Sequence, residues 1–182
     1  MPQSSRPTEH GIRVSCSISR LPFRKGLDHL LRELDTYRGI YLSSGYEYPG
    51  RYSRWDIASV RPPLEILAAG REMSFRALNP RGEVINSILA PLLAGRPYWE
   101  SFEQRGTDLA GRLKPLPALF PEEERSKQPS AFSVLRSLID EFRPLRYPRL
   151  ALVGAFGYDL LFQFDPIRLK LPRGNQEALH LF

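Results

Sequence analysis

Residues 64–88 read LEILAAGREMSFRALNPRGEVINSI, which is a series of three apolar runs separated by short polar breaks. Apolar runs joined by Gly-Arg or Asn-Pro-Arg-Gly breaks are typical of strands connected by tight turns. The pattern predicts three strands, at 64–70, 72–79 and 83–88, joined as a meander. We therefore expect an antiparallel sheet that has one face covered.

Two segments flanking this stretch have helical periodicity. In residues 26–38, GLDHLLRELDTYR, leucines recur every three or four positions, and Gly39 follows where a C-cap glycine belongs. Residues 130–142 begin with a capping serine, Ser130, and carry a second apolar stripe. Helices beside antiparallel strands predict the α+β class.

The remaining segments are shorter. Apolar or alternating runs predict further strands at residues 12–18, 40–44, 55–60, 150–159, 167–171 and 178–182. Residues 104–129 are rich in Pro, Glu, Lys and Arg with little periodicity, so we expect a flexible surface loop there. Since the last apolar run stops at Phe182, the sequence predicts a truncated chain with unpaired strand edges at 150–171 and 179–182, and hence poor solubility or an oligomer.

Composition narrows the kind of protein. The 182 residues are 42% hydrophobic and 25% charged, as in a globular domain with a core. The net charge is +6, but the basic residues are scattered singly, so nucleic-acid binding is not expected. The N-terminus lacks a signal-peptide core, and no apolar run is long enough to span a membrane, so we expect a cytoplasmic protein.

Motifs that would identify an enzyme directly are absent from the sequence. It contains no P-loop, no nucleophile elbow, no dinucleotide fingerprint and no Cys/His metal spacing. The single cysteine, Cys16, falls on an alternating apolar face and is expected to be a small buried side chain. His10, His29 and His180 lie far apart, and nothing links any of them to a general-base role.

Residues 40–56, IYLSSGYEYPGRYSRWD, hold a high density of aromatic and arginine side chains. This composition predicts either a pocket for a small planar ligand or a tightly packed corner between sheets. In the second interpretation Tyr46, Tyr48, Tyr52 and Trp55 are packing residues, and the arginines neutralise nearby carboxylates.

Four segments together resemble one enzyme family. They are LSSGYEYPGRYSRWD at 42–56, PPLEI at 62–66, PSAFSVLRSLIDEF at 129–142 and GAFGYDLLFQFDPI at 154–167. In order and spacing they resemble the N-terminal region of anthranilate synthase component I, and most of all the bacterial form that is fused to its glutamine amidotransferase. The resemblance covers essentially the whole chain, residues 1–182, as one N-terminal domain.

The resemblance implies an antiparallel two-sheet sandwich with packed helices, incomplete at the C-terminus. Tyr158 and Asp159 are expected to join the two sheets. It also implies an enzyme of tryptophan biosynthesis that converts chorismate to anthranilate and pyruvate, with Mg²⁺ and with ammonia from glutamine.

In the family the chorismate and magnesium residues lie in a later catalytic domain, which we expect to be absent from this chain. We therefore expect no catalytic, cofactor-binding or metal-binding residue here, and predict that the isolated polypeptide is inactive. The implied partners are that chorismate-binding domain and the glutamine amidotransferase, fused or separate.

The same resemblance implies half of a feedback site for L-tryptophan. The family's Leu-Leu-Glu-Ser signature aligns with residues 41–44, in which the second serine matches and the first replaces the glutamate. A tryptophan pocket needs an apolar slot and separate partners for the ammonium and carboxylate groups. Glu47 is the candidate acceptor for the ammonium group, and Arg51 suits the carboxylate. The predicted tryptophan-binding residues are Leu42, Ser43, Ser44, Glu47, Arg51 and Tyr52.

Other assignments remain open at this point. The resemblance extends to a phenazine-pathway aminodeoxyisochorismate synthase and to an aminodeoxychorismate synthase. In another class, the chain is a stand-alone amino-acid-binding module or the remnant of a disrupted gene. A basic RNA-binding domain would instead require an association that weakens with salt.

Overall fold

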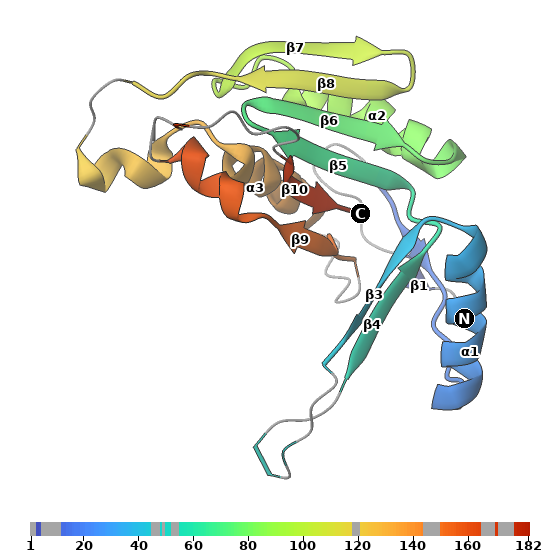
Figure 1. Ribbon diagram of the computed structural model, residues 1–182. Helices are drawn as coiled ribbons and strands as arrows, with labels where there is room; N and C mark the ends of the chain where they lie inside the picture. The colour runs from blue at the N-terminus through green and yellow to red at the C-terminus, as the bar shows by residue number, and fades with distance from the viewer. Residues whose placement is uncertain are drawn as a thin grey trace.

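The computed structural model describes residues 3–4, 12–44, 48, 50–51, 55–117, 121–143, 150–164, 170 and 177–182. These residues form antiparallel sheets, and helices pack against the largest of them (Figure 1). The α+β class predicted from the sequence is therefore confirmed.

A six-stranded sheet is the centre of the fold. Its strands are β5 (Leu64–Ala69), β6 (Glu72–Ala77), β7 (Trp99–Arg105), β8 (Asp108–Leu113), β9 (Gly154–Phe156) and β10 (Glu177–Leu181). Their spatial order is β7-β8-β6-β5-β10-β9, and every neighbouring pair is antiparallel. The predicted strands β5 and β6 thus adjoin each other at the middle of the sheet.

A smaller unit lies to one side of this sheet. It consists of helix α1 (Phe23–Thr36) and a hairpin formed by β3 (Gly39–Ser43) and β4 (Asp56–Val60). Figure 1 shows the hairpin extending away from the large sheet with α1 beside it. Two further short strands, β1 (Gln3–Ser4) and β2 (Ser15–Cys16), pair with each other.

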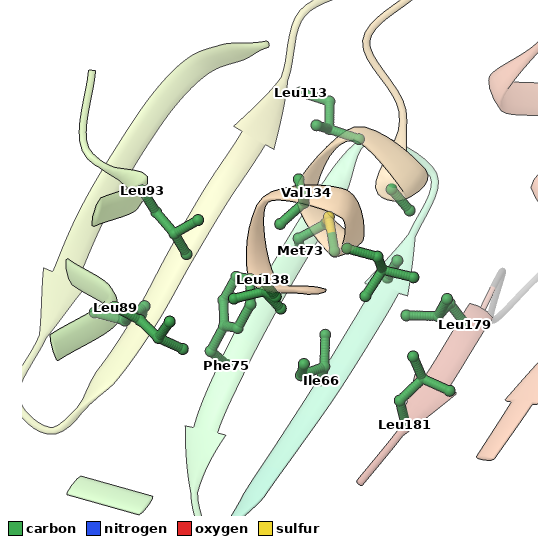
Figure 2. Close-up of a cluster of buried hydrophobic side chains, with 14 of the residues drawn as sticks. Ile66, Met73, Phe75, Leu89, Leu93, Leu113, Val134, Leu138, Leu179 and Leu181 are labelled. Atoms are coloured by element: carbon green, nitrogen blue, oxygen red, sulfur yellow. The ribbon is translucent and has the colours of Figure 1, made fainter. Parts of the chain in front are cut away.

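The hydrophobic core lies between the large sheet and two helices, α2 (Pro80–Leu93) and α3 (Ala131–Phe142). Alternate residues of the strands point to these helices, and Ile66, Met73 and Phe75 are at most 2% exposed (Figure 2). Burial of this apolar area is the main stabilising contribution to the fold. Two 3-10 segments among the described residues, η1 (Glu122–Lys127) and η3 (Tyr158–Gln163), flank α3 in sequence.

Residues 83–88, predicted as a third strand, belong to helix α2 instead. The Asn79 side chain accepts a hydrogen bond from the Arg81 N–H at 3.1 Å, and Pro80 takes the first helical position. The Asn-Pro-Arg-Gly break is therefore a helix start, where a hairpin turn was expected. The buried residues of α2 have helical spacing and extend past the predicted strand; they are Gly82, Asn86, Leu89 and Leu93.

The prediction of a flexible loop at 104–129 is wrong for the first part of this range. Strands β7 and β8 end at Arg105 and Leu113, and β8 lies inside the sheet between β7 and β6. Leu109 and Leu113 are buried, whereas the alternating Arg112 is exposed. The polar residues that favoured a loop occupy the exposed face of a strand whose other face packs into the core.

The helices predicted at 26–38 and 130–142 are confirmed within a few residues, and so are the strands at 40–44, 55–60 and 178–182. Strand β10 pairs with β5 on one side and β9 on the other. The unpaired edge expected at its position is therefore absent.

Other expectations also need correction. Only Ser15–Cys16 of the predicted strand at 12–18 is a strand, and Cys16 is half-buried. The run at 150–159 contains the short β9 and then enters η3. Gly39 begins β3 rather than capping α1. Of the strand predicted at 167–171, only Lys170 lies within the described residues, and it is not in a strand.

Tyr98, just before β7, makes a buried polar contact with α3. Its O–H donates to Ser137 Oγ at 3.1 Å, and the Ser137 hydroxyl donates to the Ser133 carbonyl oxygen at 3.2 Å. Burial raises the pKa of the Tyr98 phenol, and the Ser137 hydrogen bond and the Arg96 charge offset part of that effect. The fold therefore favours the neutral phenol.

Tyr98→Phe is expected to flatten the alkaline loss of stability. Because the native phenol keeps its proton above the unfolded pKa of about 10, its contribution is complete below that pH and is lost as the pH rises through the raised native pKa. The variant should lose about 1 kcal/mol near neutral pH through the missing hydrogen bond, but should fall less steeply above about pH 10. Urea denaturation at several pH values measures how steeply the free energy of unfolding falls with pH in wild type and variant. Equal slopes would contradict a raised pKa at Tyr98.

Candidate functional site

The β3–β4 hairpin carries the segment predicted to bind tryptophan. In its register Leu42 lies directly opposite Ile57. Ser44 and Trp55 continue this ladder, because the Ser44 N–H donates to the Trp55 carbonyl oxygen at 3.1 Å. Cross-strand partners project to the same face of a hairpin, so the register sorts the predicted residues between two faces.

Helix α1 covers one of these faces. The close approach depends on Gly39, since a Cβ atom there would lie within 3.0 Å of Leu34 Cδ2 and of the Ser59 carbonyl oxygen. Ser43, four residues after Gly39 in an alternating strand, is on this same face. Its cross-strand partner is Asp56.

The other face of the hairpin is apolar and uncovered. Leu42, Trp55 and Ile57 are 39%, 56% and 43% exposed. We call this surface, with Ser44, the open hairpin face. Large apolar side chains that gather on one exposed face are characteristic of a surface that binds a ligand or partner.

The Ser44 hydroxyl is held by the opposite strand. Its Oγ accepts a hydrogen bond from the Trp55 N–H at 3.1 Å. A hydroxyl also has one proton to donate, and none of the described residues accepts the proton of Ser44. The hydroxyl oxygen is therefore fixed in position by the opposite strand.

The neighbouring serines have different surroundings. Leu42 and Ser44 share the open hairpin face, whereas Ser43 lies on the α1 side. Among the described residues nothing forms a hydrogen bond with Asp56 Oδ1, which is buried. Asp56 therefore lies on the side of the hairpin that faces α1, away from the open hairpin face.

Of the remaining predicted residues, Arg51 is the one that the structure describes. Arg51 is exposed, and its N–H donates to the carbonyl oxygen of Tyr48, which is also exposed, at 3.0 Å. Glu47 and Tyr52 lie outside the described residues.

A buried carboxylate links the root of the hairpin to the large sheet. Glu65 of β5 is 1% exposed. It pairs with Arg38, which immediately precedes β3, and with Arg76 of β6 at 3.1 Å. His180 Nε2 of β10 lies 2.9 Å from the same carboxylate. Sequence analysis missed this cluster, whose only signal was a glutamate inside an apolar strand.

An apolar cavity of about 570 Å³ opens beside the hairpin root. Residues of α2, α3, β5 and β10 line it, together with Ser59 of β4. Ser59 alternates with Trp55 and Ile57 along β4, so it belongs to the same side as the open hairpin face. The volume is within the usual range for small-molecule pockets.

The segment expected to join the two sheets acts through a different residue. Tyr158 is 82% exposed and, with Asp159, begins η3. Gln163 at the end of η3 is buried; it accepts from the Ala131 N–H at 2.8 Å and donates to the Gly70 carbonyl oxygen at 2.7 Å. Gln163 thus ties α3 to the turn between β5 and β6.

No three His, Cys, Asp or Glu side chains in the described ranges lie close enough together to hold a metal ion. None of these residues is therefore assigned to the magnesium that the resemblance implies. None of the described helices is both long and apolar enough to cross a bilayer.

Comparison with known proteins identifies a relative of nearly the whole chain. No family model matches it. The chain is 41% identical, over 170 residues, to an anthranilate synthase of Azospirillum brasilense. The aligned region is 93% of this chain but 23% of that protein, so the chain spans about a quarter of the length of its relative. The resemblance predicted from the sequence is thereby confirmed: along almost its entire length, this chain is related to part of an anthranilate synthase.

Proposed function

We propose that the chain is part of an anthranilate-forming enzyme of tryptophan biosynthesis, and that its hairpin forms one wall of a feedback site for L-tryptophan. The observation that carries the proposal is the 41% identity over 170 residues to an anthranilate synthase. An aligned region that covers 93% of the chain necessarily includes the hairpin. The name of that relative supports anthranilate as the product over aminodeoxyisochorismate or aminodeoxychorismate.

The open hairpin face has the chemistry that an indole ring requires. Leu42, Trp55 and Ile57 offer apolar and aromatic surface, against which a second indole packs by offset or edge contact. The Ser44 hydroxyl donates to the ligand's carboxylate, since its oxygen is already held by the Trp55 N–H. Arg51, near the tip, is of the right type for the same carboxylate.

The chain's own part in the enzyme is regulatory in this proposal. Ammonia, chorismate and Mg²⁺ act at a catalytic domain, and tryptophan at the hairpin shifts that domain between conformations by binding one of them more tightly. Glu65 and Arg38 join the hairpin root to the large sheet. They are therefore the contacts through which a movement of the hairpin reaches the rest of the chain.

L-Tryptophan is expected to bind the wild-type chain saturably in isothermal titration calorimetry. Ser44→Ala removes the hydroxyl donor and Trp55→Ala removes aromatic surface, so each should weaken binding about tenfold, which corresponds to about 1.4 kcal/mol. Ser43→Ala is the matched control, because this adjacent serine lies on the α1 side of the hairpin. Its affinity should stay within about twofold of wild type.

Thermal melting followed by circular dichroism establishes that all three variants are folded. Saturable binding that Ser43→Ala weakens as much as Ser44→Ala would place the ligand on the other face. No saturable heat with the wild-type chain would mean that this wall does not bind tryptophan by itself.

A further inference from the structure

Three arginines from separate segments converge on a second cavity, of about 510 Å³. Arg38 comes from the junction of α1 and β3, Arg61 from the corner between β4 and β5, and Arg81 from the first turn of α2. No acidic side chain lines this cavity. Its lining therefore carries positive charge only, in contrast to the apolar cavity beside the hairpin root.

Backbone geometry at Arg61 helps to build this arrangement. Among the described residues it is the one non-glycine residue with a positive φ, 53°, which L side chains seldom adopt. The Arg61 carbonyl oxygen accepts from Arg81 Nη2 at 3.0 Å. Its guanidinium carbon lies 3.6 Å from the centre of the Tyr37 ring. The Arg81 guanidinium is thus held by the Arg61 carbonyl oxygen, and the Arg61 guanidinium stacks on the Tyr37 ring.

The charges around the cavity are not balanced. Arg38 pairs with Glu65, and Arg61 pairs with Glu33 at 2.8 Å. Neither carboxylate lines the cavity. No carboxylate of the described residues lies within ion-pair distance of Arg81. Within the described part of the chain, the Arg81 guanidinium thus has no carboxylate partner.

We propose that this cavity binds the phosphate group of a small metabolite. Guanidinium groups present several fixed N–H donors and match phosphate oxygens in pairs. Donors that converge from three directions suit a tetrahedral group with three free acceptor oxygens better than a planar carboxylate. The start of α2 at Pro80 adds the positive end of a helix dipole on the same side. This proposal does not depend on tryptophan binding at the hairpin.

Nuclear magnetic resonance titration at constant ionic strength tests the site with inorganic phosphate and with glycerol 3-phosphate. Both probes are expected to shift the backbone signals of Tyr37, Arg38 and Arg61 saturably. Arg81→Gln should weaken both at least about tenfold, since it removes a charged donor from the cavity. Arg136→Gln, a matched change on an exposed position of α3, should leave the affinity unchanged.

Arg61→Gly gives a second, independent variant. It removes another guanidinium from the cavity, so phosphate binding should weaken at least about tenfold. Glycine relieves the positive φ, but the variant also loses the Glu33 ion pair and the Tyr37 stacking, so the melting temperature should change little. Unchanged phosphate affinity in Arg61→Gly would contradict a contact between this arginine and the ligand.

Four results would overturn the proposal. They are equal phosphate affinity in wild type and Arg81→Gln, equal weakening by Arg136→Gln, tighter binding of succinate than of phosphate, and tighter binding of a short RNA than of glycerol 3-phosphate. The third would assign the cavity to carboxylates, and the fourth would assign it to nucleic acid.

Discussion

Glu65→Ala is expected to lower the free energy of unfolding by about 3 kcal/mol. Removal of one partner of a buried charge pair typically costs about 3–5 kcal/mol, because the remaining charges lose their counter-ion where water reaches them poorly. The side chains of Arg38 and Arg76 are 51% and 52% exposed, so water compensates part of the loss and the lower end applies. For a chain of 182 residues, the melting temperature should fall by roughly 6–12 °C.

The same substitution is also expected to loosen the hairpin. Arg38 immediately precedes β3 and reaches Glu65 across to the large sheet. Without the carboxylate, the root of the hairpin loses a charged contact to β5. Amide hydrogen exchange should therefore accelerate more in β3 and β4 than in β6 and β8, whose ladder hydrogen bonds remain.

Glu103→Ala is the matched control for this prediction. Glu103 of β7 pairs with Arg105, but both side chains are exposed, so the pair contributes at most about 0.5 kcal/mol. Urea denaturation with linear extrapolation compares the two variants under the same conditions. Equal losses of unfolding free energy in the two variants would contradict the claim that burial makes the Glu65 ion pairs more stabilising than the exposed Glu103 pair.

Elements whose local sequence agrees with their final environment were predictable. Residues 130–142 combine a capping serine with a single apolar stripe, and the structure shows α3 with a capping box at Ser130. The strand prediction for residues 83–88 is wrong because six positions of a helix with a mixed surface also fit the alternation of a strand. The buried residues Leu89 and Leu93, beyond that window, are what distinguish the helix.

The loop prediction that covered strand β8 is wrong for a different reason. Its exposed face carries charged residues such as Arg112, while its core face is formed by Leu109, Gly111 and Leu113. Composition averaged over 104–129 hides this alternation. Only pairing with β6 and β7 supplies the hydrogen bonds that make the segment a strand.

The candidate sites were also predictable only where their residues are close together in the sequence. The candidate tryptophan-binding residues Leu42 to Ser44 are contiguous, so a short stretch of sequence was enough to propose them. The Glu65 cluster joins residues 115 positions apart in the case of His180. The three arginines of the phosphate cavity likewise meet only because α2 begins where a hairpin turn was expected. Contacts across a sheet are not visible until strand order and register are known.

Gly39→Ala is expected to cost about 3 kcal/mol in the free energy of unfolding, although it adds a single methyl group. A Cβ atom at this position would lie within 3.0 Å of the Ser59 carbonyl oxygen and of Leu34 Cδ2. Overpacking typically costs about 1–3 kcal/mol, and the upper end applies because one obstacle is the backbone of the partner strand. Either α1 or the hairpin must move to accept the methyl group.

Gly26→Ala is the matched control, with an expected effect of opposite sign. Gly26 lies in α1, and a Cβ atom there would meet Leu21 Cβ at 3.8 Å, an ordinary contact. Alanine is the better helix former by about 0.8–1.0 kcal/mol, so this variant should be slightly more stable than wild type. Thermal and urea denaturation of both variants measure the contrast. Similar losses in the two variants would mean that the close approach at Gly39 does not decide the effect.

Tryptophan titration of Gly39→Ala separates the two faces of the hairpin. The added methyl group points toward α1, whereas Leu42, Ser44 and Trp55 lie on the open hairpin face. At a temperature where the variant is folded, its tryptophan affinity should therefore fall less than that of Ser44→Ala, even though its loss of stability is larger. A larger fall in affinity would instead mean that the ligand requires α1 to be docked against the hairpin. The binding wall would then include the face that carries Ser43 and Asp56.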